Sequence, residues 1–94
     1  MLGFLPGEVD LRLLRSFVVL AEEQHFTRAA ERLGVGQPVL SQRLTRLETQ
    51  VGVALVWRDR RNFELTAAGV RLLRAARRAL DEVERGIAEA RAAL

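Results

Sequence analysis

The sequence predicts a mainly α-helical fold in which three short helices and a two-stranded hairpin precede one long C-terminal helix. Three observations support this order. Apolar residues recur at helical spacing over most of the chain, stretches with glycine or proline separate the helical segments, and an alternating apolar pattern occupies residues 53–65. The chain has 94 residues, which is room for one small core with an appended helix. Its 49% hydrophobic and 29% charged residues are typical of a globular protein.

The first helix is expected to follow residues 1–8, which contain two glycines and a proline and should form a flexible leader. Asp10 is a good N-cap, and Val9 and Leu14 are spaced for a hydrophobic staple. The helix should end near Glu23 and serve as scaffold. Its apolar face is expected to consist of Leu11, Leu14, Phe17, Val18 and Ala21.

Two further helices are expected on either side of a tight turn. The second covers residues 26–33, with Thr27 as its expected N-cap and Gly34 placed to end it in a left-handed conformation. The third covers residues 37–51, with Pro38 in the first turn, where a missing N–H is tolerated. Its apolar face is expected to consist of Leu40, Leu44, Leu47 and Val51.

The spacing of small and apolar residues predicts a helix-turn-helix unit at about residues 26–45. Ala30 lets the two helices cross closely, and Gly34 permits the sharp turn between them. At about 100° per residue, the polar residues of the third helix then point away from the core. This outward set comprises Pro38, Gln42, Thr45 and Arg46, flanked by Val39, Ser41 and Arg43.

Residues 53–65 are predicted to form two short strands, because apolar residues alternate on both sides of the charged turn at residues 59–62. We expect Trp57 and Phe63 to pack beneath this hairpin. A helix, a helix-turn-helix and a hairpin, in that order, make a winged helix, so residues 9–65 are expected to form one winged helix-turn-helix domain. Its hairpin turn carries the arginines Arg58, Arg60 and Arg61.

Residues 66–94 are predicted to form a single long helix with Thr66 as its N-cap. At about 1.5 Å per residue this helix would be about 43 Å long, so it should project from the small domain. Apolar residues recur along it at alternating spacings of 3 and 4, which is a heptad seam. Such a seam on a projecting helix needs a partner helix, and we therefore expect a homodimer. The seam consists of Leu73, Ala76, Leu80, Val83, Ile87, Ala90 and Leu94.

The available side chains favour binding over catalysis. The chain has no cysteine and a single histidine, His25, which is expected to be a solvated loop residue. Asp10, Glu31 and Glu48 are expected to be helix caps or solvated side chains, and no phosphate-loop motif is present. We therefore expect no enzymatic activity, no metal and no cofactor. No segment has the length of a membrane span or of a secretory signal, so a cytoplasmic location is expected.

Positive charge gathers in the middle of the chain, where residues 25–61 carry seven arginines against three acidic residues, a net charge of +4. In a DNA major groove, glutamine can pair with adenine, serine can bond to a base or phosphate, and valine can contact a thymine methyl group. Arg43 and Arg46 are long enough to reach phosphate or guanine. Thr27 and Arg28, at the start of the second helix, could hold a backbone phosphate. The hairpin arginines could contact phosphate or the minor groove.

Several linked segments resemble the DNA-binding end of LysR-type transcriptional regulators. These segments are residues 26–33 (FTRAAERL), 37–41 (QPVLS), 47–48 (LE), 51–52 (VG) and 65–69 (LTAAG). The resemblance covers about residues 9–94. It implies a winged helix-turn-helix followed by a linker helix that pairs with its copy in a second subunit. The implied base-facing residues are Gln37, Pro38, Val39, Ser41 and Gln42, with Arg61 in the wing.

The leading hypothesis is therefore a dimeric bacterial transcription regulator that binds double-stranded DNA at an approximately palindromic operator. Members of the LysR-type family continue into an effector-binding domain, so a small-molecule effector is expected only if such a domain follows. The alternative is a helical dimerisation adaptor that uses the same surfaces to bind a protein partner. RNA binding is disfavoured because the chain lacks aromatic platforms for bases.

Overall fold

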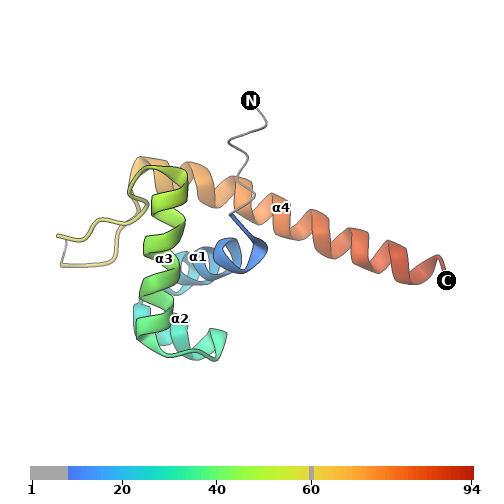
Figure 1. The fold of residues 1–94 in the computed structure, drawn as a ribbon, viewed down its shortest axis with the longest axis horizontal. Coiled ribbons are helices and arrows are strands. Elements are labelled where there is room, and N and C mark those ends of the chain that lie inside the picture. The colour runs from blue at the N-terminus through green and yellow to red at the C-terminus, as the bar shows by residue number, and fades with distance from the viewer. Residues whose placement is uncertain (1–8, 60) are drawn as a thin grey trace.

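The structure, a computed structural model, describes residues 9–59 and 61–94. The expected leader at residues 1–8 and the wing residue Arg60 lie outside the described residues. The mainly helical fold is confirmed, and its helices are α1 (Leu11–Glu23), α2 (Phe26–Leu33), α3 (Gln37–Val51) and α4 (Ala67–Ala92). In Figure 1 the first three helices form one body, the segment after α3 extends to one side, and α4 runs away from the body on the other side.

The helix ends follow local capping rules. The Asp10 carboxylate accepts a hydrogen bond from the Leu13 N–H at 2.9 Å, and the Thr66 hydroxyl accepts one from the Gly69 N–H at 3.0 Å. Gly34 ends α2 at φ 70°, and Gly52 ends α3 at φ 90°. Glycine adopts these left-handed conformations more readily than any residue with a side chain, which is why both ends were predictable from the sequence.

The start of α2 differs from the prediction. His25, and not Thr27, is the N-cap, because its Nδ1 accepts a hydrogen bond from the Arg28 N–H at 3.2 Å. Thr27 lies within the first turn, where its hydroxyl is free to bond elsewhere. His25 is exposed as expected, but it is a helix cap rather than a featureless loop residue.

The core lies where α1, α2 and α3 meet, and it includes fully buried Phe17, Leu20, Leu47 and Leu55. The predicted apolar face of α1 was partly wrong. Leu11 is 46% exposed, whereas the buried residues of α1 include Leu13, Ser16, Val19 and Leu20. Because α2, α3 and α4 all pack on α1, more of its circumference is covered than one amphipathic stripe provides. Leu14 is half-buried beside the core.

In α3 the predicted face is confirmed for Leu40, Leu44 and Leu47, all of which are buried. Val51 is 40% exposed, so its assignment to that face was wrong. It occupies the last turn of α3.

The predicted two-stranded wing is not formed as strands among the described residues. The hairpin has one antiparallel bridge, between Val56 and Leu65. The predicted alternation fails because the consecutive residues Leu55 and Val56 are both buried, while Trp57, expected beneath the hairpin, is 42% exposed. Phe63 packs as expected: it meets Phe26 of α2 edge-to-face, with 6.4 Å between ring centroids.

The long helix α4 has two parts with different surroundings. Near its start, Leu72 and Leu73 pack against the core, and Ala76 is 1% exposed against the body. From residue 81 onward every residue is exposed. The predicted seam is therefore exposed only in its distal part, because the proximal part packs on α1.

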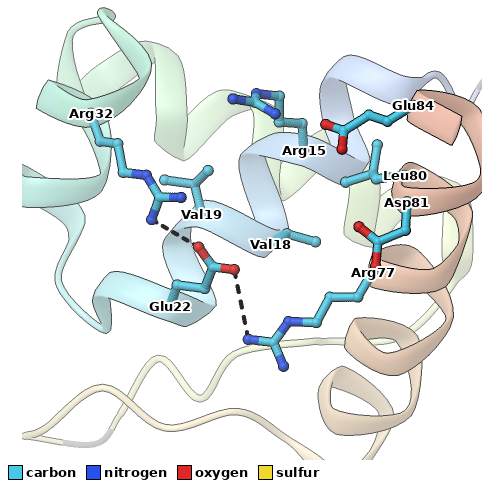
Figure 2. A pocket seen from close by; sticks show the side chains of 9 residues that line it. All are labelled: Arg15, Val18, Val19, Glu22, Arg32, Arg77, Leu80, Asp81 and Glu84. Atoms are coloured by element: carbon cyan, nitrogen blue, oxygen red, sulfur yellow. Dashed lines mark ion pairs between the residues drawn. The ribbon is translucent and has the colours of Figure 1, made fainter. Parts of the chain in front are cut away.

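A charged groove marks the place where α4 leaves the body, and Figure 2 shows its side chains. Glu22 of α1 lies between Arg32 of α2, at 2.8 Å, and Arg77 of α4, at 3.8 Å. The hydrogen bonds that Arg32 donates to the carboxylates of Glu22 and Glu23 raise the pKa of Arg32 above its usual value. The exposed pairs tie α2 and α4 to α1 but contribute little stability. Within residues 9–59 and 61–94, no helix is long and apolar enough to span a membrane.

Candidate nucleic-acid interface

The outer face of α3 is polar and free of carboxylates. The burial of Leu40, Leu44 and Leu47 turns the remaining residues of the helix outward. Residues 37–47 contain no acidic residue, so this face presents nothing that would repel an anion. The exposed residues of this face are Gln37, Pro38, Val39, Ser41, Gln42, Thr45 and Arg46.

Gln37 is held in one orientation at the start of α3. Its Oε1 accepts a hydrogen bond from the Thr27 hydroxyl at 3.1 Å. The amide nitrogen therefore remains as the donor that can reach outward, and Thr27 is committed to α3 rather than to capping α2. This bond brings two predicted site residues together across the turn of the helix-turn-helix.

Arg43 is directed toward α1. Its guanidinium donates a hydrogen bond to the Ser16 hydroxyl at 3.1 Å, and Ser16 is 2% exposed. Arg43 is half-buried and therefore helps to hold α3 on α1, unlike its exposed neighbour Arg46.

A groove beside Arg43 contains a basic residue that sequence reasoning missed. Arg12 of α1 lines it together with Val39, Gln42 and Arg46 of α3. The groove's one carboxylate, Asp10, accepts a hydrogen bond from the Leu13 N–H as the α1 cap. Arg12 carried no signal in the sequence, because only the packing of α1 across α3 places it near the outward face.

Arg28 lies at the start of α2 and is folded back on α1. Its guanidinium donates to the Glu23 carbonyl oxygen at 3.2 Å and lies 3.7 Å from the Glu23 carboxylate. The side chain nevertheless remains 60% exposed. A second groove, lined by Phe26, Gln37, Ser41 and Thr45 among others, separates this end of α2 from the hairpin.

Glu48 anchors the hairpin to α3. Its Oε2 accepts hydrogen bonds from the backbone N–H groups of Leu55, at 2.7 Å, and Val56, at 3.3 Å. Its Oε1 pairs with the Arg58 guanidinium at 2.6 Å, and the side chain is only 14% exposed. Glu48 is thus a structural anchor, and its prediction as a cap or solvated side chain was wrong. Arg58 is half-exposed at 52% but held by this pair.

Arg61 is the described arginine at the hairpin tip. It is exposed and lines a hollow with His25, Trp57 and Phe63, between the hairpin and the start of α2. The hairpin, α2 and α3 therefore contribute basic side chains to adjoining parts of the surface.

The predicted dimerisation residues divide between the two parts of α4. Ala76 is buried, and Leu73 and Leu80 are half-buried against the body. The distal seam remains exposed: Val83 is 39% and Ile87 46% exposed, with Ala90 and Leu94 beyond them.

The sequence matches the bacterial regulatory helix-turn-helix proteins of the lysR family over residues 11–70. The chain belongs to the lysR family. Its relatives include the HTH-type transcriptional regulator AlsR of Bacillus subtilis, 48% identical over 84% of this chain and 26% of AlsR. The Hca operon transcriptional activator HcaR of Escherichia coli is 46% identical over 88% of this chain and 28% of HcaR. This lysR-family chain thus spans about a quarter of the length of these two regulators.

Solved structures of similar proteins share this arrangement over most of the chain. The BenM_DBD/catB site 1 DNA complex matches with a TM-score of 0.85 at 35% identity, over 88% of this lysR-family chain and 93% of that chain. The CbnR_DBD–DNA complex matches with a TM-score of 0.84 at 40% identity, over 90% of this chain and 98% of that chain.

Proposed function

We propose that this chain binds double-stranded DNA in a sequence-specific manner, as the DNA-binding part of a LysR-type transcriptional regulator. One observation carries the proposal: the exposed face of α3 is polar, lacks carboxylates and is backed by a rigid apolar core. A helix of this kind fits the major groove, where side chains reach base edges. Two of the similar structures are complexes with DNA, and this supports the proposal.

The proposed contacts fall into two groups. Residues near the start of α3 would read bases, and Gln37 would act as a hydrogen-bond donor because its amide oxygen is bonded to Thr27. Arginine and hydroxyl side chains around them would bind phosphates and set the register. The base-reading group is Gln37, Pro38, Val39, Ser41 and Gln42. The phosphate or minor-groove group is Thr27, Arg28, Arg43, Thr45, Arg46, Arg58, Arg60 and Arg61.

The distal seam of α4 supports a homodimer as the DNA-binding unit. Exposed Val83 and Ile87 lie four residues apart, as neighbouring core positions of a heptad do, on a helix that projects from the body. Two copies would place their α3 helices on successive turns of one duplex, at an approximately palindromic operator in the bacterial cytoplasm. A small-molecule effector would require a further domain, and the relatives AlsR and HcaR are longer than the matched region.

Selection of bound duplexes from a random-sequence library tests this function. We expect an enriched motif with two related half-sites, and an affinity that falls steeply with salt because arginines displace condensed counterions. Fluorescence anisotropy on the enriched site across a salt series measures both effects. Sequence-blind binding, or no binding at low salt, would contradict the proposal.

Charge reversal in the hairpin separates this function from the protein-binding adaptor. Arg61→Glu should weaken DNA binding to all sequences while leaving self-association unchanged, because the hairpin is remote from the distal seam. An adaptor that uses α4 would be indifferent to this substitution.

A further inference from the structure

The hairpin base forms a junction between α3 and the start of α4. Where the chain enters the hairpin, the Glu48 carboxylate of α3 accepts hydrogen bonds from the backbone N–H groups of Leu55 and Val56. On the outgoing side, the Thr66 N–H donates to the Leu55 carbonyl oxygen at 2.9 Å. Leu55 therefore links the two helices: its N–H donates to Glu48 of α3, and its carbonyl oxygen accepts from Thr66, the N-cap of α4.

Thr66 bonds in three directions at this junction. Its hydroxyl donates to the Ala54 carbonyl oxygen at 2.7 Å and accepts from the Gly69 N–H at 3.0 Å. Together with the backbone bond to Leu55, these contacts fix the first turn of α4 on the hairpin base. Thr66 is only 9% exposed, so water cannot readily replace them.

Gly69 brings the backbone of α4 against the same segment. A Cβ at this position would collide with the Leu55 carbonyl group, which shows how closely the helix approaches. About two turns later, the buried Ala76 holds α4 on the body a second time. Two separate attachments leave the helix little freedom to tilt.

We propose that this junction, consisting of Glu48, Leu55, Thr66 and Gly69, fixes the angle between α3 and α4 and thereby determines which half-site spacing the dimer accepts. The inference rests on the proposed DNA-binding function. At about 1.5 Å per residue, Val83 lies about 26 Å along α4 from Thr66. A tilt of about 10° would move the seam by about 4–5 Å. That displacement exceeds the separation of about 3.4 Å between successive base pairs.

The test measures the affinity of the 94-residue chain for duplexes in which two selected half-sites are moved apart or together one base pair at a time. For the wild type, a change of two base pairs should cost about tenfold or more, because protein or DNA must twist to follow it. Thr66→Val keeps the shape of the side chain but removes both hydroxyl bonds, and should reduce that loss to about threefold or less. Binding to a single half-site should stay unchanged, since Thr66 is nearly buried and lies outside the outward face of α3.

Two further variants control this experiment. Thr66→Ser retains the hydroxyl and should keep the wild-type spacing profile. Glu48→Gln retains an acceptor for the Leu55 N–H but loses its charge pair with Arg58, and should flatten the profile as well. An unchanged profile in Thr66→Val, or equal losses at every spacing including the single half-site, would overturn the proposal.

If the junction variants do not fold, a distance measurement between α3 and α4 in a chain with an unaltered junction tests whether the angle is fixed. The sequence has no cysteine, so Thr49→Cys on α3 and Ala88→Cys on distal α4 provide two unique spin-label sites on exposed positions. Labelled chain diluted with unlabelled chain should give one narrow intramolecular distance distribution. A broad distance distribution would contradict the proposal that the junction fixes the angle between α3 and α4. A wild type that selects no duplex would instead count against the proposed function itself.

Discussion

Ser41 is the residue whose proposed role can be isolated most cleanly. It is exposed on the outward face of α3, and no part of the core depends on it. Ser41→Ala should relax preference at one base-pair position and cost about 1–3 kcal/mol on the preferred site. Competition binding between the preferred site and its single-base variants measures this effect. Thr49→Ala, two turns further along α3, should retain the full preference, and equal behaviour of the two variants would argue against a base contact.

Arg12 is expected to contribute through phosphate contact, because it lines the groove beside Gln42 and Arg46. Arg12→Ala should weaken binding to all sequences and reduce the salt slope of log affinity by about 1. Arg71→Ala, at an exposed position of α4, is the matched control and should leave the slope unchanged. Anisotropy titrations at four or five salt concentrations measure both slopes. A loss confined to the preferred sequence would contradict a phosphate role.

The residue roles that sequence reasoning missed depend on partners that are distant in the chain. Glu48 bonds to Arg58, and Thr27 bonds to Gln37; each pair is separated by ten positions. Local spacing rules describe caps and faces within a few residues, so they identified Asp10 and Gly34 but not these bonds. The packing of α2 on α3 and of the hairpin on α3 had to be known first.

At the scale of elements, two glycines of α4 should respond oppositely to the same substitution. Gly69→Ala places a methyl group against the Leu55 carbonyl and should lower the free energy of unfolding by about 1–3 kcal/mol. Gly86→Ala enters open space in an exposed helical turn and should stabilise the helix by up to about 1 kcal/mol. Urea denaturation followed by circular dichroism measures both. Equal effects at the two positions would contradict the close approach at Gly69.

The helices were predictable because their ends are encoded locally. Asp10 and Thr66 accept backbone hydrogen bonds, while Gly34 and Gly52 adopt left-handed conformations. The covered face of α1 was less predictable, since nearly every residue from 16 to 21 is apolar and periodicity cannot select among them. Contacts with three other helices decide which are buried.

The hairpin is the element whose secondary structure the sequence pattern predicted wrongly. Its alternating pattern predicts strands, but Leu55 and Val56 are both buried and their N–H groups bond to the Glu48 side chain. A side chain on α3 thus supplies bonds that a strand would seek from a neighbouring strand. One bridge is the result, and period-two alternation could not reveal it.

At the scale of the whole molecule, the distal seam should control self-association. Ile87→Glu places a charge on the exposed seam and should convert the expected dimer to a monomer without loss of helicity. Ala88→Glu adds the same charge one residue off the seam and should remain dimeric. Sedimentation equilibrium measures the masses, and circular dichroism the helicity. A dimeric Ile87→Glu variant would place the contact elsewhere.

The proximal part of α4 packs on the body and the distal part is exposed, so the two parts of this one helix are under different evolutionary constraints. Leu72, Leu73 and Ala76 cannot change freely, because they pack against the body of their own chain. Residues 81–94 are exposed and lie outside the core, so we expect substitutions there to leave the fold of the body intact and to change self-association. After a gene duplication, changes confined to these last turns would be enough to stop two paralogues from pairing with each other. Each paralogue would keep its winged helix-turn-helix domain unaltered.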